Sequence, residues 1–128
     1  MNKTAIERCI HEYFAALQNV QVESWLATFA ADGACHDPAG TPPHVGYAAL
    51  QQFFEFVTAA FASVTIGAEQ ILVQGSRAAV TWRANGVGLN GRAVQFAGID
   101  VFEMNAAGKI QTVWGFWEPQ SLFAELSA

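Results

Sequence analysis

The chain has 128 residues, of which 52% are hydrophobic and only 13% are charged, with a net charge of −5. This length is typical of one domain with its own core, here 1–128, and the shortage of basic residues argues against nucleic acid or an anionic membrane as a partner. Lys3, Glu7 and Arg8 interrupt the N-terminal segment, so we expect no secretory signal. Cys9 and Cys35 are interpreted as buried small hydrophobes in a reducing compartment, so a cytoplasmic protein is expected.

The spacing of apolar residues predicts three helices, over residues 4–20, 22–30 and 47–61. Between the second and the third, residues 34–38 are expected to be extended, and Pro42 and Pro43 predict a loop that lasts until Gly46.

After the third helix the apolar period changes to two, which predicts strands over residues 64–73, 78–89, 93–104 and 110–117. Asn90 and Gly91 predict a hairpin with a type I′ turn, and a short helical turn is expected after Pro119. Helices followed by an antiparallel meander predict an α+β fold with four strands and the short segment near Asp37. If such a sheet curls around its helices, the space between them is a cone-shaped apolar pocket.

Asp100 stands out because it lies in the middle of an apolar strand. Alternation along residues 93–104 places it on the same face as Phe96 and Phe102. An unpaired buried carboxylate is costly, so such a group raises its pKa, stays protonated and can then donate a hydrogen bond. A bulge or a backbone amide partner would explain a single aspartate in a strand equally well.

Two further residues lie where chemistry could use them. Tyr13 lies on the buried face of the first predicted helix, although an ordinary core tyrosine would look the same. Asp37 lies between His36 and Pro38 at the end of the extended segment, where turn formation also explains an aspartate. Because Asp37 is near a loop, we expect water and polar groups to keep it ionised.

Together these residues resemble the bacterial ketosteroid isomerases, which belong to a nuclear transport factor 2-like superfamily that includes SnoaL-like and polyketide cyclase-like proteins. The resemblance rests on Tyr13 in Glu-Tyr-Phe-Ala-Ala-Leu, Asp37 in His-Asp-Pro-Ala-Gly and Asp100 in Gly-Ile-Asp-Val-Phe. Similar segments extend it over nearly the whole chain, namely residues 29–34, 40–46 and 108–112 with Trp117.

The resemblance implies a cone of three helices on a strongly curved, mainly antiparallel sheet, and a homodimer. It implies a steroid delta-isomerase, which moves a C=C bond of a 3-ketosteroid or similar hydrophobic ketone from the β,γ to the α,β position. Asp37 would be the general base, while Tyr13 and a protonated Asp100 would hold the oxyanion; a neutral aspartate in this role is a known feature of that family. No cofactor is called for, and the three histidines lack metal-ligand spacing.

The pocket for such a substrate is expected to be lined by Phe54, Phe96, Phe102, Val113 and Trp117. By strand parity Trp117 faces inward, whereas Trp114 and Phe116 face outward and suit a dimer interface.

One departure from the family concerns support for Tyr13. Phe29 and Phe54 stand where some relatives have tyrosines that hydrogen-bond to the catalytic tyrosine, so Tyr13 would lack that support.

Other functions stay open on the sequence alone. Polyketide cyclase-like or other carbon-acid chemistry would use Asp37 on a different substrate. An epoxide hydrolase relative would need an Asp-Arg-Asp arrangement, and Gly98 stands where the arginine would be required. A dehydratase-like reaction could use His36 or His44, although both are more simply read as solvated loop residues. The last alternative is a module for hydrophobic ligand binding or dimerisation without catalysis.

Overall fold

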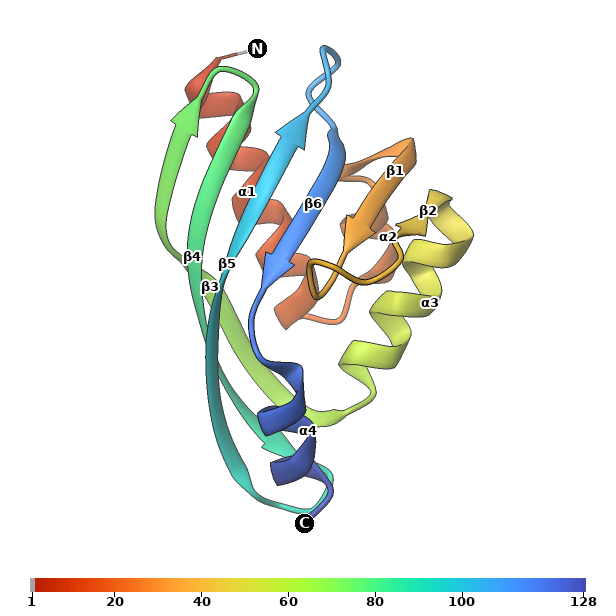
Figure 1. Ribbon diagram of the computed structural model, residues 1–128, viewed down its shortest axis with the longest axis vertical. Coiled ribbons are helices and arrows are strands. Elements are labelled where there is room, and N and C mark those ends of the chain that lie inside the picture. Colours follow the sequence, from red (N-terminus) through yellow and green to blue (C-terminus); the bar gives the residue numbers. More distant parts are fainter. Residues whose placement is uncertain (1) are drawn as a thin grey trace.

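The computed structural model, which describes residues 2–128, confirms the predicted α+β fold (Figure 1). The elements follow in chain order as α1 (Lys3–Gln18), α2 (Val22–Leu26), β1 (Phe29–His36), β2 (His44–Val45), α3 (Gly46–Thr58), β3 (Phe61–Gln74), β4 (Arg77–Gly88), β5 (Ala93–Met104), β6 (Ile110–Phe116) and α4 (Pro119–Leu126). Among the helices of this described part of the chain, none is long and apolar enough to cross a bilayer.

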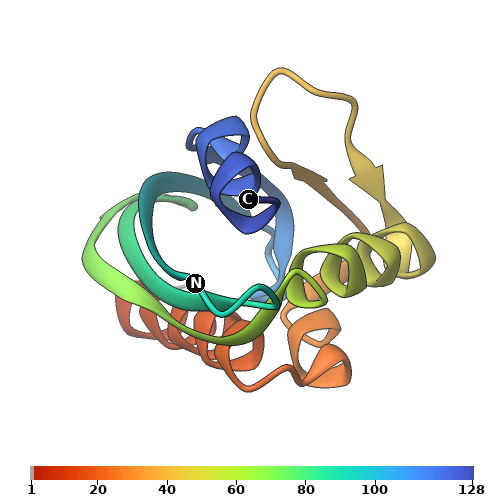
Figure 2. The same ribbon diagram turned by 90° about the horizontal axis from the view of Figure 1, so that it is seen from below.

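All six strands belong to one mixed sheet, in the order β2-β1-β6-β5-β4-β3. Strands β3 to β6 form the predicted antiparallel meander, whereas β1 runs parallel to β6. Figure 2 shows β3, β4 and β5 curling into a C-shaped wall, with α1 packed along one side and α4 at its open end. The sheet is therefore strongly curved, and its concave face is covered by helices as predicted.

The core lies between this concave face and the helices. The buried face of α1 follows the helical period of three and four, and it consists of Ile6, Cys9, Ile10, Tyr13, Phe14 and Ala16. The side chain of Asn2 caps the start of the helix by accepting a hydrogen bond from the Ala5 amide, at 2.8 Å. Cys9 and Cys35 are buried and free, as predicted.

The structure differs from the prediction between the second and third helices. Helix α2 ends at Leu26 rather than at residue 30, because Phe29 pairs with Ile110 of the parallel strand β6 and so starts β1. Two residues of the predicted loop form β2, in which His44 pairs with Cys35. The sheet therefore has six strands rather than five.

The hairpin between β4 and β5 lies where it was predicted, but its turn is not type I′. The Gly91 amide donates to the Gly88 carbonyl at 3.0 Å, so Leu89 and Asn90 are the central residues. A type I′ turn needs positive φ at both central residues, whereas here Gly91, after them, has φ 81° and Asn90 does not. The Asn90 side-chain amide lies 3.0–3.1 Å from the carbonyl oxygens of Glu125, Leu126 and Ala128 and so joins this turn to the end of α4.

Candidate active site

Three adjacent strands bring Asp37 and Asp100 together. Asp100 on β5 is paired with Gly115 on β6, and Asp37 directly follows β1 on the other side of β6. A Cβ atom added at Gly115 would lie 3.0 Å from Asp37 Cγ and 3.2 Å from Asp100 Oδ1. The two carboxyl groups are therefore neighbours across a glycine whose missing side chain leaves them room.

Asp100 is buried, with 4% of its surface exposed, and accepts a hydrogen bond from Trp82 Nε1 at 3.0 Å. Burial and then the neighbouring charge of Asp37 raise the pKa of Asp100 well above its usual range, against the opposing effect of the Trp82 hydrogen bond. The burial predicted for this residue is confirmed, and the pKa shift has the predicted direction.

Asp37 is half-buried rather than solvated, and this differs from the prediction. Because the loop after β1 folds against β6, Trp117 Nε1 reaches Asp37 Oδ1 at 2.5 Å. Burial raises the pKa of Asp37, while the Trp117 hydrogen bond and the nearby His44 lower it. The rise is larger for Asp100, so Asp37 is the more acidic of the two carboxyl groups.

Tyr13 is 2% exposed, and its ring meets Phe102 edge-on with centroids 5.2 Å apart. Burial raises the pKa of Tyr13 well above its usual value, and the charges of Asp100, Cys35 and Asp37 raise it further. The hydroxyl therefore stays protonated and is available as a hydrogen-bond donor.

Two cavities lie beside these residues and share part of their walls. The inner cavity has a volume of about 60 Å³ and is lined by Tyr13 and Asp100, whereas the outer one has a volume of about 530 Å³. Both are lined by Asp37, Phe53, Val57, Trp117 and Phe123. Asp37 therefore stands where the inner cavity meets the outer one, and the outer volume is in the range of small-molecule sites.

The predicted pocket residues divide into two groups. Phe96 and Trp117 line the inner cavity, as expected. Phe54, Phe102 and Val113 line neither cavity and are almost completely buried in the core. This corrects the prediction: alternation places a side chain on the concave face, but the narrow end of the cone is filled with packed side chains.

Gly98 makes room for the two tryptophans that bind the carboxyl groups. A Cβ atom there would lie 2.6 Å from Trp82 Cζ2 and 2.9 Å from Trp117 Cβ. Any side chain at position 98, including an arginine, would displace these indoles.

Sequence reasoning missed the part played by indole N–H groups. Trp82 and Trp117 donate to Asp100 and Asp37, and Trp25 packs against Tyr13 with centroids 5.6 Å apart. The alternation along β4 is a signal that could have been used, because it places Trp82 on the inward face of that strand. In the structure, buried residues alternate with exposed ones from Arg77 to Gly88, and one of the outward positions is half-buried.

The two candidate histidines lie on opposite faces of the sheet, since His44 pairs with the buried Cys35 and His36 is the next residue along β1. His44 contacts Phe53 in the wall of the outer cavity, with centroids 4.8 Å apart, so it is not the solvated loop residue that was predicted. His36 stacks on Trp114 with centroids 5.9 Å apart. Within residues 2–128, no group of three or more His, Cys, Asp and Glu side chains is placed to hold a metal ion.

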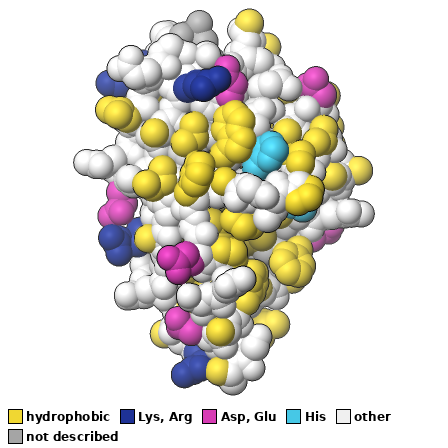
Figure 3. Space-filling model, in the orientation of Figure 1, with side chains coloured by type: hydrophobic (Ala, Val, Ile, Leu, Met, Phe, Trp, Pro, Cys, Tyr) yellow, Lys and Arg dark blue, Asp and Glu magenta, His cyan; other side chains and the backbone are white. Residues whose placement is uncertain are grey.

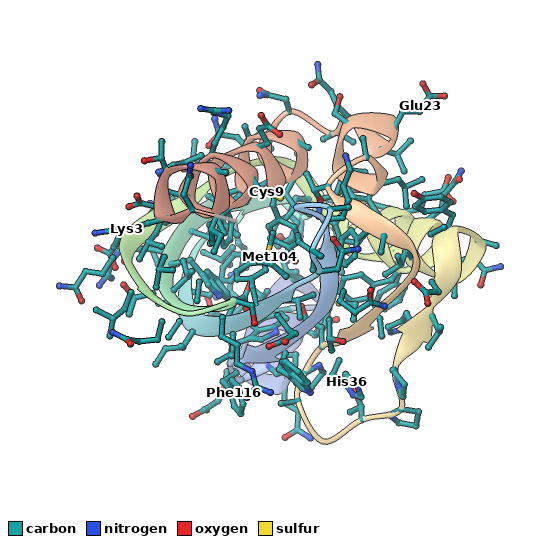
Figure 4. All side chains as sticks on the ribbon, turned by 90° about the horizontal axis from the view of Figure 1, so that it is seen from above. Lys3, Cys9, Glu23, His36, Met104 and Phe116 are labelled. Carbon is teal, nitrogen blue, oxygen red and sulfur yellow. The ribbon has the colours of Figure 1, made fainter. Side chains whose placement is uncertain are left out.

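The convex face of the sheet carries the outward aromatic residues. Figure 4 shows His36 and Phe116 on the side away from α1, whereas Cys9 and Met104 point into the interior. Phe116 is 52% exposed and Ile99 is 46% exposed. Figure 3 shows hydrophobic side chains gathered on this face around a histidine, over β5 and β6.

Comparison with known proteins gives the following likenesses. A family model described as a SnoaL-like domain matches residues 10–113. An NTF2-like protein of unknown function from Burkholderia pseudomallei is 16% identical over 100% of both chains, with a TM-score of 0.84. The epoxide hydrolase/cyclase-like enzyme SalBIII, described with a role in pyran ring formation in the polyether salinomycin, is 24% identical over 93% of this chain and 95% of that one, with a TM-score of 0.82.

A third structure is that of RV0760c from Mycobacterium tuberculosis in complex with estradiol-17beta-hemisuccinate. It is 22% identical and covers 91% of this chain and 95% of its own, with a TM-score of 0.79. At these identities the three structures establish the fold.

Proposed function

The chain belongs to the SnoaL-like domain family, and from that premise we propose that it is an isomerase that moves a C=C bond of a hydrophobic ketone from the β,γ to the α,β position. The observation that carries this proposal is the pair of carboxyl groups on either side of Gly115, both lining the inner cavity together with Tyr13. One carboxyl group is deeply buried and the other is the more acidic, which is the division of roles that acid and base need.

The proposed reaction begins with the ionised form of Asp37. Its carboxylate takes a proton from the carbon between the carbonyl and the alkene. The electron pair of that C–H bond forms a new C=C bond to the carbonyl carbon, and the carbonyl π pair moves onto the oxygen to give a dienolate. Tyr13 and neutral Asp100 donate hydrogen bonds to this oxyanion in a site of low polarity. Protonated Asp37 then returns the proton to the far carbon of the dienolate, which restores the carbonyl and leaves the double bond conjugated with it.

The hydrogen bond from Trp82 determines which oxygen of Asp100 is free to carry the proton in the proposed reaction. Trp82 Nε1 uses Asp100 Oδ1 as its acceptor, which leaves Oδ2 to carry the proton that is donated to the oxyanion. The Trp82 bond by itself favours the ionised form, so the donor role proposed for Asp100 rests on its burial, which raises its pKa in spite of that bond.

The substrate that we propose is a hydrophobic ketone with a narrow reactive end, such as a 3-ketosteroid. The outer cavity is walled largely by apolar side chains, among them Phe53, Phe56, Val57 and Phe123. That RV0760c was solved with a steroid derivative supports a ligand of this kind. The inner cavity has only about the volume of two water molecules. The side chains between the two cavities would therefore have to move before a ring of the substrate could enter it.

A second candidate is a cyclase, which the adjacency of Asp37 and Asp100 also favours. Asp37 would take a proton from a substrate hydroxyl or carbon acid, and Asp100 would give its proton to the oxygen of an epoxide or carbonyl that is attacked within the same molecule. The likeness to SalBIII supports this candidate. Gly98 still argues against an Asp-Arg-Asp epoxide hydrolase, but ring closure within one molecule needs no activated water.

The test is to mix the purified protein with a Δ5-3-ketosteroid or, separately, with 3-cyclohexenone, and to follow the conjugated enone by absorbance. We expect turnover above buffer, and a loss of about 100-fold to 10,000-fold in kcat for Asp37→Asn. Asp32→Asn is the matched control, because Asp32 is exposed on β1 and accepts a hydrogen bond from Gln111.

Absence of turnover with both ketones would reject the isomerase. An epoxy alcohol that can close a six-membered ring then tests the cyclase, and turnover of that substrate which Asp37→Asn abolishes would establish it. Failure with all three substrates would leave ligand binding without catalysis.

A further inference from the structure

The indole N–H of Trp25 has no hydrogen-bond partner. Trp25 is completely buried, and among residues 2–128 its Nε1 is the one buried side-chain nitrogen or oxygen atom without a partner. Folded proteins pair nearly all such groups, because an unpaired buried donor has lost its bonds to water. A donor left free at this position therefore calls for an explanation.

The surroundings of Trp25 contain one polar ring. Four aromatic rings pack against the indole, and their centroids lie 4.8–6.3 Å away; they belong to Tyr13, Phe29, Phe53 and Phe54. Of these four, only Tyr13 carries a polar atom. The indole also lowers the pKa of Tyr13, although its N–H falls short of hydrogen-bond geometry.

We propose that Trp25 is a positioning residue, whose N–H stabilises the Tyr13 oxygen when Tyr13 donates its hydroxyl proton toward the substrate oxyanion. It would replace the tyrosine hydroxyls that some ketosteroid isomerases carry at the positions of Phe29 and Phe54. The inference rests on the proposed role of Tyr13 and deepens it.

The physical argument is that the Tyr13 oxygen is a stronger acceptor during the reaction than before it. As Tyr13 shares its proton with the dienolate, its oxygen gains negative charge, and hydrogen bonds to charged groups are shorter and stronger than neutral ones. A bond that strengthens only then lowers the barrier and raises kcat. Trp25 lines neither cavity, so it acts through Tyr13 and not on the substrate.

The kinetic test uses Trp25→Phe, which keeps an aromatic ring and removes the N–H. We expect kcat to fall about tenfold with little change in KM. Trp114→Phe, on the convex face, is the matched control and is expected to leave both constants within twofold. Adding Phe29→Tyr to Trp25→Phe supplies a new hydroxyl donor on a ring whose centroid lies 6.0 Å from that of Tyr13, and is expected to recover most of the lost kcat.

A binding test decides the inference even if no ketone is turned over. The probe is 2-naphthol, a planar phenol that mimics the dienolate. We expect Trp25→Phe to weaken its binding about tenfold, and the Trp25 indole proton resonance of the wild type to move downfield on binding but not in Tyr13→Phe.

The outcomes separate the two proposals. Ketone turnover with an unchanged kcat in Trp25→Phe overturns the inference and leaves the isomerase standing. No turnover, with the naphthol affinity dependent on Trp25, rejects the isomerase and upholds the inference. If naphthol does not bind, or binds equally well to Trp25→Phe, the inference is wrong.

Discussion

At the scale of single residues, the candidate site consists of three titratable groups, each with a tryptophan beside it. Trp82 and Trp117 donate to Asp100 and Asp37, while Trp25 lies against Tyr13. An indole N–H is a donor that never carries a charge of its own, so it can fix a carboxyl group without adding a competing titration. The pKa values of the two carboxyl groups are then set mainly by how deeply each is buried.

The pH dependence of turnover tests the hydrogen bond to the base. Asp37 must be ionised to accept a proton, so activity should fall as the pH drops through its raised pKa. Trp117→Phe removes a donor that lowers this pKa, so the acid limb of kcat/KM should move to higher pH. Phe96→Leu, on the same wall without a hydrogen bond, is the control; an acid limb that stays in place in Trp117→Phe would contradict the assignment.

The buried Asp100 should make the free energy of unfolding depend on pH. Its folded pKa is raised above the unfolded value, so the folded state keeps a proton that the unfolded state releases, and the free energy of unfolding falls as the pH rises between the two values. Asp100→Asn should reduce this slope by up to about 1.4 kcal/mol per pH unit and be more stable than the wild type at pH 8. Urea unfolding at pH 5 and pH 8 measures the change of the free energy of unfolding with pH, and Asp32→Asn is the control. If the wild type and Asp100→Asn show the same pH dependence, Asp100 is ionised in the folded state and the account is wrong.

At the scale of the elements, the site depends on three neighbouring strands, β1, β6 and β5, and on two glycines that leave space on them. Gly115 separates the carboxyl groups, and Gly98 gives room to the tryptophans that bind them. The parallel pairing of β1 with β6 places Asp37 at the end of the strand next to the one that carries Gly115. The geometry of the site is therefore a property of strand order as much as of side chains.

A glycine pair tests this dependence on space. Gly98→Ala would bring a Cβ atom 2.6 Å from Trp82 Cζ2 and 2.7 Å from the Phe116 carbonyl oxygen, so it should destabilise the fold by about 1–3 kcal/mol and lower activity. Gly67→Ala, on β3, is the matched control, because nothing lies within 4 Å of the added atom. Equal free energies of unfolding for the two variants would show that the fold does not depend on the absence of a side chain at Gly98.

Local patterns predicted the parts of the fold that depend on local order. The period of α1, the meander from β3 to β6 and the inward face of Asp100 were all confirmed. The start of β1 was missed because Phe29 is drawn into a strand by Ile110, more than 80 positions away along the chain. The sequence indicated Tyr13, Asp37 and Asp100 as candidates, and strand parity indicates that Trp82 and Trp117 face inward. The acceptors of the two indole donors could not be predicted, because they depend on how distant strands pair.

At the scale of the whole molecule, the two faces of the curved sheet differ in what they carry. The concave face holds the packed core at one end and the two cavities at the other, with α4 contributing Pro119, Gln120 and Phe123 to their walls. The convex face leaves Ile99 and Phe116 exposed beside the stacked pair His36 and Trp114.

We propose that the convex face forms a homodimer, because it exposes Ile99 and Phe116. Phe116→Glu should convert the dimer to a monomer, since burying a charge there costs more than burying an aromatic ring. Leu89→Glu, which changes an exposed leucine in the hairpin turn, should leave the dimer intact. Analytical ultracentrifugation decides between the two states, and a monomeric wild type would contradict the proposed interface.

The central claim is that two neighbouring carboxyl groups are held in different protonation states. Carbon-13 NMR of protein labelled at the aspartate carboxyl carbons, recorded from pH 6 to pH 8, measures this most directly. We expect one resonance typical of a neutral carboxylic acid, lost in Asp100→Asn, and a carboxylate resonance that is lost in Asp37→Asn. Two carboxylate resonances from these residues at pH 7 would contradict the account.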